Sequence, residues 1–438
     1  MVSPRMNKTL LPVLLLLGAC TREPRTPTVV PVSDRPAQRA TVDVPPPPPE
    51  EHPVSAPVDA QRAMATAANQ LGVDLYRALA TGDANFALSP ASVAVAFGMT
   101  AAGARAETLE QMRRALHHTL PAGEVHAALG ALSQRWNRVA DGFTLATANR
   151  LFGHAPAPFE APFLALTRDQ YGAALERVDF AQPEPARTHI NRWVAQQTRD
   201  KIAELLPARS IDPLTRLVLV NALYLDARWQ HPFEPGRTQP GAFHGPSGDA
   251  QAPMMHATRS YAFAEGGGVK VLEMPYRGGE YVMDVFLPEA RDGLRALESR
   301  LSAAQIAQWC AGLSERQVAV TLPRFRVGGG TIALKEAMSA LGMPRAFDRN
   351  GADFLAMSNP PSPAERLYIS NAYHQVFVDV REAGTEAAAA TAVVMAARGA
   401  GMPVGQPASF VADHPFLFAI RERETGAVLF MGRVNDPR

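Results

Sequence analysis

The sequence contains very little cysteine, with only Cys20 and Cys310 in 438 residues. Because Cys20 falls within an N-terminal export signal described below, Cys310 has no partner and the chain can form no intrachain disulfide. No histidine or asparagine signature accompanies Cys310, so we interpret it as a small buried hydrophobic residue near Trp309 and not as a nucleophile. The roughly 380 residues after the N-terminal region are enough to build a large hydrophobic core.

An excess of charge of either sign is also absent. The sequence has 43 Lys and Arg residues against 42 Asp and Glu residues, which gives a formal net charge of +1. A nearly neutral chain has no strong field to attract nucleic acid or acidic lipid. We therefore expect no nucleic-acid partner.

Motifs of enzyme active sites are missing as well. The chain has no G-x-S-x-G elbow, no H-E-x-x-H zinc motif, no P-loop and no G-x-G-x-x-G that opens a helix. The neighbours His117 and His118 lack a second ligand pair, so we expect a solvated helix end there and not a metal site. The sequence thus predicts no enzyme, no cofactor and no metal.

The first 20 residues are typical of a bacterial export signal. Arg5 and Lys8 precede an apolar run, residues 10–17, that is too short to span a bilayer. The tetrapeptide Leu17-Gly18-Ala19-Cys20 resembles a lipobox, in which the cysteine receives a diacylglyceryl group and becomes the new N-terminus. We predict a lipoprotein signal peptide at residues 1–20, lipid attachment at Cys20 and a membrane-anchored protein of the cell envelope. The alternative is an ordinary signal peptide in which Cys20 is incidental.

Residues 21–58 differ in composition from the rest of the chain. They contain 11 prolines in 38 residues, including the run 45–49. Such a segment cannot bury apolar surface and adopts extended conformations. At about 3.1 Å per residue it could hold a domain about 100 Å from a membrane. We predict a disordered, proline-rich tether.

Hydrophobic periodicity predicts helices early in the remaining chain and strands late. Apolar residues recur at helical spacing over residues 64–79, 125–139 and 190–205. Strand-like runs are residues 143–151, 217–225, 269–274, 281–287, 318–322, 367–369, 376–380, 416–420 and 428–431. Regular alternation of strand and helix is absent. The pattern therefore indicates an α+β fold with large mixed sheets.

Residues 382–399 form an unusual segment. They follow the predicted strand 376–380, and no residue between 387 and 397 is larger than methionine. Four consecutive alanines favour a helix, so one interpretation is an alanine-rich surface helix followed by a loop. In a strand, however, the alternate residues 385–397 are all small or apolar, and Glu386 lies on the opposite face. Such a strand can enter the middle of a sheet without placing a charge against the core.

This segment also carries a family resemblance. The run Glu382-Ala383-Gly384-Thr385-Glu386, with four alanines and Thr391 after it, resembles the hinge of the serpins, a family of serine protease inhibitors. Further serpin-like motifs follow the family's order: Asn85-Phe86-Ala87-Leu88-Ser89-Pro90-Ala91-Ser92; Leu219-Val220-Asn221-Ala222-Leu223-Tyr224 with Trp229 and Pro232-Phe233; Leu367-Tyr368-Ile369-Ser370 with His374; Ala412-Asp413-His414-Pro415-Phe416; and Phe430-Met431-Gly432-Arg433-Val434. The chain is identified as a member of this family over about residues 60–438, and we predict a serpin domain at residues 59–438.

The resemblance implies a fold and a mechanism. The fold has three β-sheets with a large central sheet, about eight or nine helices and an exposed reactive-centre loop, here at about residues 382–409. A target protease attacks the loop and forms an acyl-enzyme. The hinge then inserts into the central sheet as an extra strand and traps the protease before deacylation.

Residue roles follow from the same resemblance. The hinge consists of Glu382, Gly384, Thr385, Glu386, Ala387, Ala388, Ala389, Ala390 and Thr391, and Thr385 is expected to pass from solvent to the inner face of the sheet. A polar cluster, the shutter, latches the central strands and consists of Ser89, Ser92, Asn221 and His374. Insertion begins at the breach, where Trp229 lies and where Arg324 pairs with Glu382.

The resemblance also implies the reactive bond. The fourteenth residue beyond Gly384 is Arg398, so we predict the bond Arg398–Gly399 and a trypsin-like target. The stretch from Arg398 to Pro415 is several residues longer than is usual, which keeps open the bond Met395–Ala396 and an elastase-like target. We predict a monomeric suicide inhibitor that forms a covalent complex with a serine protease. The alternative is a non-inhibitory serpin that acts as a binding or chaperone-like module.

Overall fold

Helices are concentrated in the first half of the part that the structure describes. The structure is a computed structural model, and it describes residues 55–385 and 406–438 apart from residues 138 and 141. Over these residues it has nine α-helices: α1 (Val58–Leu79), α2 (Pro90–Ala101), α3 (Ala106–Ala115), α4 (Ala122–Trp136), α5 (Ala161–Tyr171), α6 (Pro183–Gln197), α7 (Leu294–Arg300), α8 (Ala303–Ala311) and α9 (Lys335–Ala340). Three short 3-10 helices are η1 (Pro235–Arg237), η2 (Pro344–Phe347) and η3 (Pro363–Glu365).

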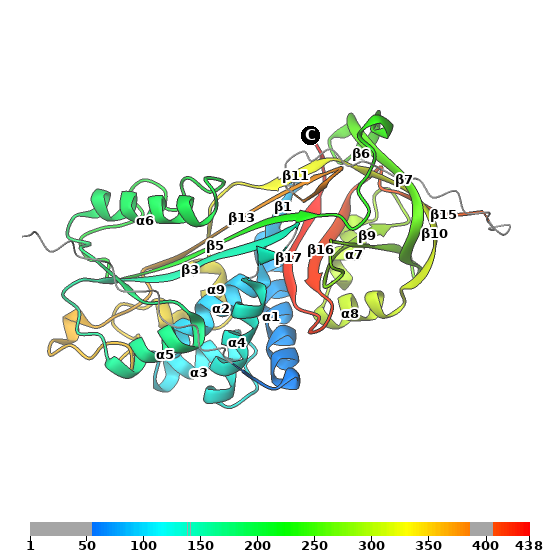
Figure 1. Cartoon of the computed structure of the whole chain (residues 1–438). Helices are drawn as coiled ribbons and strands as arrows, with labels where there is room; N and C mark the ends of the chain where they lie inside the picture. Colours follow the sequence, from blue (N-terminus) through cyan, green and yellow to red (C-terminus); the bar gives the residue numbers. More distant parts are fainter. Residues whose placement is uncertain (1–54, 138, 141, 386–405) are drawn as a thin grey trace, which may run out of the picture. The chain divides into compact units, whose positions relative to one another are not determined.

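A mixed sheet lies between helix α6 and helices α2 to α5 (Figure 1). The strand order is β11 (Phe325–Gly328), β13 (Asn371–Arg381), β14 (Gly384–Thr385), β5 (Leu217–Arg228), β3 (Phe143–His154) and β2 (Val139–Ala140), with β12 (Ile332–Ala333) on β13 and β4 (Glu176–Val178) on β3. The central strands β5 and β13 run parallel and pair directly from Val218↔Asn371 to Tyr224↔Phe377. At one end of this pair the two-residue strand β14 lies between them.

A second sheet is built mainly from the second half of the chain. Its order is β1 (Phe86–Leu88), β17 (Val428–Val434), β16 (Phe416–Glu422), β9 (Tyr281–Pro288), β8 (Val269–Pro275), β7 (Gly248–Gly266), β10 (Ser314–Pro323) and β15 (Ala408–Val411), with β6 (Gln239–Gly245) on β7. Strand β7 is 19 residues long and pairs with β6 at one end and β8 at the other. The family resemblance implies three sheets, one large and two smaller. Because β7 is continuous, the strands outside the central sheet form a single hydrogen-bonded sheet in this structure.

The central sheet is covered on both faces. Helix α6 lies on one side of β3, β5 and β13, and α2 to α5 lie on the other (Figure 1). Residues 217–225 of β5 are all buried. On the α6 side, Ile190 and Val194 share a core cluster with Val218 and Val220. A strand enclosed on both faces is expected to be continuously apolar, which is the pattern of this segment apart from Asn221.

The helix predicted over residues 125–139 ends at Trp136, and Val139 belongs to strand β2. Two further elements differ from the sequence prediction. Helix α6 ends at Gln197, because residues Arg199 and Asp200 have positive φ angles, and Ile202 is buried from the following turn. Residues 367–369 form no strand; Leu367 and Ile369 are buried, but this segment belongs to neither ladder. In both cases apolar side chains reach the core from irregular backbone, which periodicity cannot distinguish from regular structure.

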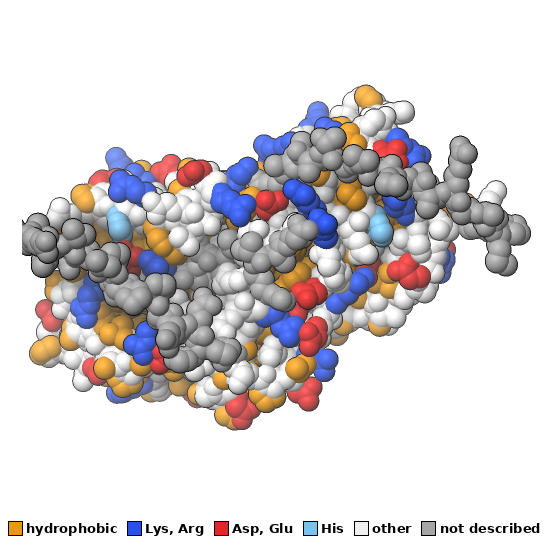
Figure 2. All heavy atoms as spheres, in the orientation of Figure 1, with side chains coloured by type: hydrophobic (Ala, Val, Ile, Leu, Met, Phe, Trp, Pro, Cys, Tyr) orange, Lys and Arg blue, Asp and Glu red, His pale blue; other side chains and the backbone are white. Residues whose placement is uncertain are grey.

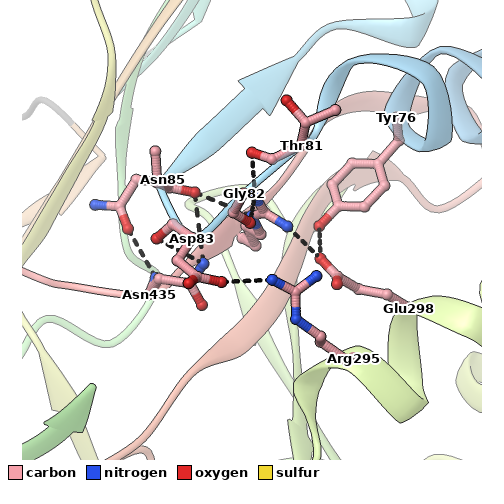
Figure 3. A network of polar contacts seen from close by, with 10 residues as sticks. Tyr76, Thr81, Gly82, Asp83, Asn85, Arg295, Glu298 and Asn435 are labelled. Atoms are coloured by element: carbon pink, nitrogen blue, oxygen red, sulfur yellow. Dashed lines mark hydrogen bonds and ion pairs between the residues drawn. The ribbon is translucent and has the colours of Figure 1, made fainter. Parts of the chain in front are cut away.

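Buried Arg433 links the last strand to helix α7 and to the turn that follows helix α1. Arg433 in β17 is 2% exposed and donates to Glu298 in α7 at 2.9 Å and to the backbone carbonyls of Thr81, Gly82 and Ala84. Glu298 also accepts from the Tyr76 hydroxyl of α1, as Figure 3 shows. A buried guanidinium requires this many acceptors to offset its desolvation. The network therefore links β17 to α7, to α1 and to the turn between α1 and β1.

Candidate functional site

The hinge begins as a strand inside the central sheet. Gly384 and Thr385 form β14 and pair with Arg381 and Val380 of β13 on one side. On the other side they pair with Arg228 and Ala227 of β5. A Cβ atom at position 384 would lie 2.0 Å from the carbonyl oxygen of Ala227, so this close approach requires glycine.

Thr385 is already buried. Its side chain is 0% exposed, and its hydroxyl is 2.6 Å from the hydroxyl of Tyr276. The family resemblance implies that this side chain starts in solvent, whereas the structure places it on the inner face of the sheet. The first two residues of this segment after Ala383 are therefore part of the central sheet in this structure.

Trp229 lies at the point where β14 enters the sheet. Its indole N–H donates to the carbonyl of Arg381 at 2.9 Å, and its backbone N–H donates to the carbonyl of Ala383 at 3.0 Å. The indole ring stacks on Tyr276 with centroids 4.5 Å apart. Trp229 therefore hydrogen-bonds the turn at residues 381–383 and also packs against Tyr276, the residue that contacts Thr385.

A buried carboxylate fastens the base of the hinge. Glu382 accepts from the Arg324 Nε at 2.7 Å and from the Thr238 hydroxyl, while its carbonyl accepts from the Phe233 N–H at 2.9 Å. Burial raises the pKa of Glu382, but the hydrogen bonds from Arg324 and Thr238 outweigh burial, and the net pKa is lowered. Glu382 is therefore ionised at neutral pH and bound to the neighbouring loop.

The four residues of the predicted shutter meet beneath β5 and β13. The N–H of Ser89 donates to His374 Nε2 at 3.0 Å, so the proton of the neutral ring is on Nδ1, which donates to the Asn221 side-chain oxygen. The amide of Asn221 donates to the carbonyl of Ser92 at 2.7 Å. All four side chains are at most 2% exposed, and burial lowers the pKa of His374 to about 3. The cluster thus links α2 to both central strands through neutral groups.

Asn149 of β3 also belongs to this cluster and is absent from the sequence-based site. Its side-chain oxygen accepts from Asn221 at 2.6 Å and from the Ser92 hydroxyl at 3.2 Å. Asn149 and Asn221 are paired directly across β3 and β5. An asparagine within a predicted strand was the available signal, because a buried amide needs hydrogen-bond partners.

The geometry is that of a sheet with an opening at one end. From Val218 to Tyr224, β5 is bonded directly to β13, so no strand fits between them there. Beyond Tyr224 the two strands separate and β14 enters. A strand that continued from β14 towards Val218 would therefore have to break the direct β5–β13 pairing.

Comparison with known proteins identifies this architecture. The family model described as "Serpin (serine protease inhibitor)" matches residues 66–437. The chain is 37% identical to the leukocyte elastase inhibitor of Equus caballus over 387 residues, which covers 85% of this chain and 99% of that protein.

The chain is a serpin. The solved structure of Serpin48 from Tenebrio molitor superposes with a TM-score of 0.76 at 30% identity and covers 86% of this chain and 99% of that one. Human thyroxine-binding globulin in complex with thyroxine gives a TM-score of 0.77 at 26% identity, with coverage of 86% and 99%. The predicted fold class is confirmed.

Several predicted residues of this serpin lie outside the described part of the chain. They are Cys20, the hinge residues Glu386, Ala387, Ala388, Ala389, Ala390 and Thr391, the bond Arg398–Gly399 and its alternative Met395–Ala396. Within the described residues, no helix combines the length and apolarity needed to cross a bilayer.

Cys310 of this serpin is partly buried in α8. Burial raises the pKa of its thiol to about 12, with the Asp284 carboxylate adding to the rise. Because the thiolate is the reactive form, a thiol that stays protonated at neutral pH makes a poor nucleophile. The environment of Cys310 therefore agrees with a structural residue.

Proposed function

We propose that this serpin is a suicide inhibitor of trypsin-like serine proteases. The observation that carries the proposal is strand β14: two hinge residues are hydrogen-bonded on both sides in the middle of the sheet. A chain that has begun to insert at Gly384 and Thr385 is prepared to continue along the same path. The residues that follow, 387–391, are four alanines and a threonine, which fit a buried strand.

The proposed reaction starts as substrate cleavage. The protease serine oxygen attacks the carbonyl carbon of Arg398, and an ester forms as the bond to the nitrogen of Gly399 breaks. The protease histidine first takes the serine proton and then gives it to the leaving amine. Release of the loop lets the hinge continue between β5 and β13, and the ester-linked protease moves with it before water can complete hydrolysis.

Specificity for trypsin-like enzymes follows from Arg398. A guanidinium at the scissile residue fits a protease pocket that contains a buried carboxylate. The alternative bond, Met395–Ala396, would instead suit an elastase-like enzyme. We assign Arg398 because it occupies the family's position relative to Gly384.

A second candidate is a serpin that binds a ligand and inhibits nothing. The likeness to thyroxine-binding globulin, which is solved with thyroxine bound, shows that the same fold also occurs in a small-molecule carrier. The hinge distinguishes the two functions, because only an inhibitor needs small residues throughout the inserting strand. This hinge has them, which favours the inhibitor.

We also propose that the protein is an exported lipoprotein. The lipobox at residues 17–20 and the proline-rich residues 21–58 support a serpin domain tethered by lipid at Cys20 to a membrane of the cell envelope. The absence of Asp at position 21 favours the outer membrane in a Gram-negative cell. We propose a monomer whose protein partner is the target protease.

The test is formation of a covalent complex. Incubation with trypsin should produce a band that resists SDS and has the summed mass of both proteins. The serpin cleaved in its loop by a non-target protease should melt far above the intact form, because the inserted strand is then in place. A loop that is cut with no complex and no rise in melting temperature would favour the binding module.

A further inference from the structure

Two buried hydroxyl groups connect the central sheet to the segment that follows β8 of the second sheet. The hydroxyl of Thr385 in β14 lies 2.6 Å from the hydroxyl of Tyr276, and both side chains are 0% exposed. The Lys and Arg side chains on the face drawn in Figure 2 reach water, whereas these two hydroxyls can bond only to protein groups. Within the described residues, each hydroxyl has the other as its one hydrogen-bond partner.

The position of the Tyr276 hydroxyl is set by residues outside the hinge. The Tyr276 backbone forms an antiparallel bridge with Trp229, and its N–H donates to the carbonyl of Tyr281 at 3.0 Å. Its ring stacks on the indole of Trp229, with centroids 4.5 Å apart, and meets the ring of Phe143 edge-on at 6.4 Å. Burial raises the pKa of Tyr276, so the phenol keeps its proton and can donate or accept. A fixed hydroxyl is therefore present where β14 lies between β5 and β13.

Three consecutive carbonyls fix the turn before the hinge. The indole N–H of Trp229 donates to the carbonyl of Arg381 at 2.9 Å, and its backbone N–H donates to the carbonyl of Ala383 at 3.0 Å. The N–H of Phe233 donates to the carbonyl of Glu382 at 2.9 Å. Because this turn is fixed, position 385 cannot shift along the sheet, and its side chain is the one that meets the phenol.

Packing alone would favour valine at position 385. The residues paired with Thr385 on either side, Ala227 and Val380, are apolar and fully buried. Valine has nearly the shape of threonine and does not bring a hydroxyl into an apolar sheet, where an unpaired hydroxyl costs free energy. The phenol of Tyr276 accounts for the hydroxyl, because beside valine this phenol would itself be buried without a partner.

We propose that Tyr276 is a positioning residue that selects a hydroxyl side chain at position 385 and so retains the start of the hinge in the central sheet. A side chain without a hydroxyl at 385 leaves the phenol unpaired and weakens the hold on β14. The inference rests on the proposed inhibitory function and deepens it. After the loop is cut, insertion continues from a residue that Tyr276 already holds.

Hydrogen exchange measures how firmly β14 is held. A double-mutant cycle compares the intact wild type with Tyr276→Phe, Thr385→Val and the double variant, and mass spectrometry follows the peptide that contains residues 384 and 385. Each single change leaves one buried hydroxyl unpaired, so we expect exchange to rise about fivefold in each. The double variant removes both hydroxyls and should exchange no faster than either single variant. Strictly additive effects would overturn the selection.

Two controls separate the hydroxyl contact from a general effect on the core. Thr385→Ser keeps the hydroxyl and loses a methyl group. The ratio of exchange in the valine variant to that in the serine variant should fall when Tyr276→Phe is added, because the missing methyl group contributes equally in both backgrounds. An unchanged ratio would overturn the selection. Tyr171→Phe removes the buried hydroxyl of helix α5 that lies 2.7 Å from His126, and its effect should add independently to that of Thr385→Val.

Trypsin inhibition supplies the second readout, the number of serpin molecules consumed per trypsin inactivated. Thr385→Val should raise this number in the wild-type background and have no further effect beside Tyr276→Phe, because the phenol is then absent. Equal increases in both backgrounds would argue against the selection. A wild type that forms no complex, but whose exchange still shows the coupling, would overturn the inhibitory function and leave the contact between Tyr276 and Thr385 intact.

Discussion

The hydroxyl of Thr385 lies 2.6 Å from the hydroxyl of Tyr276, and both side chains are fully buried. Thr385 belongs to the hinge, and Tyr276 follows strand β8 of the other sheet and stacks on Trp229. This contact connects the first inserted side chain to the residues that frame the opening. Any change that alters the size or charge at position 385 must therefore act on the core.

Replacement of Thr385 by arginine should convert the inhibitor into a substrate. An unpaired guanidinium in this position would cost several kcal/mol, so β14 could not remain in the sheet. The loop should still be cut after Arg398, but no covalent complex should accumulate on SDS gels. Thr385→Val is the matched control, because it keeps the size and loses one hydrogen bond of about 1 kcal/mol. Normal complex formation by Thr385→Arg would contradict insertion along this path.

The Glu382–Arg324 pair should stabilise the intact protein at neutral pH. Because the pKa of Glu382 is lowered on folding, its contribution is present above the unfolded pKa of about 4.3 and is lost as pH falls through the folded pKa. Glu382→Gln should lower the free energy of unfolding by about 1 kcal/mol at pH 7, since Arg324 is partly exposed. Urea unfolding of both single variants and the double variant measures the coupling. Strictly additive effects would show that the pair contributes nothing.

Acid should destabilise the protein through His374. Burial lowers its folded pKa to about 3, whereas the unfolded pKa is about 6.5. The unfolded chain therefore binds the proton first, and stability is full above pH 6.5 and falls by up to about 1.4 kcal/mol per pH unit below it. His374→Gln should be less stable at pH 7 and should show a smaller slope between pH 7 and 5. Parallel pH profiles of variant and wild type would exclude His374 as a source of this dependence.

Arg398 should determine which protease is trapped. Arg398→Ala removes the positive charge proposed to bind the acidic pocket, so complexes with trypsin should disappear while the melting temperature stays the same. Sequencing of the released loop fragment identifies the bond directly. A stable complex cut after Met395 would move the reactive bond to Met395–Ala396 and the target to an elastase-like enzyme.

Cys20 should decide whether the protein partitions with membranes. If Cys20 carries the lipid, Cys20→Ser should move the protein from the membrane fraction to the soluble fraction, because the acyl chains supply the anchor. Fractionation followed by immunoblotting measures the distribution. The same distribution for both forms would remove the lipid anchor from the proposal.

The hinge shows how far local sequence can define a functional element. Small or apolar residues on alternate positions indicate that the segment can be a strand. The close approach of Gly384 to the carbonyl of Ala227 is visible only in the structure. The depth of insertion could not be predicted, because it depends on how far β5 and β13 separate. Asn149 was missed for a similar reason: its role depends on the register that places it opposite Asn221.

Local patterning therefore determined the helices of regular apolar period and the buried central strand, since each depends on residues near one another in the chain. The family rested on the resemblance of its motifs to those of the serpins. Tertiary structure alone decided that α6 ends at Gln197, that residues 367–369 pack without joining a ladder and that Thr385 is already inserted. It also decided which residues of β5 and β13 pair directly, because the two strands are far apart in the chain and lie side by side only in the folded sheet. Contacts of this kind depend on sheet register, and register is fixed by the packing of the whole core.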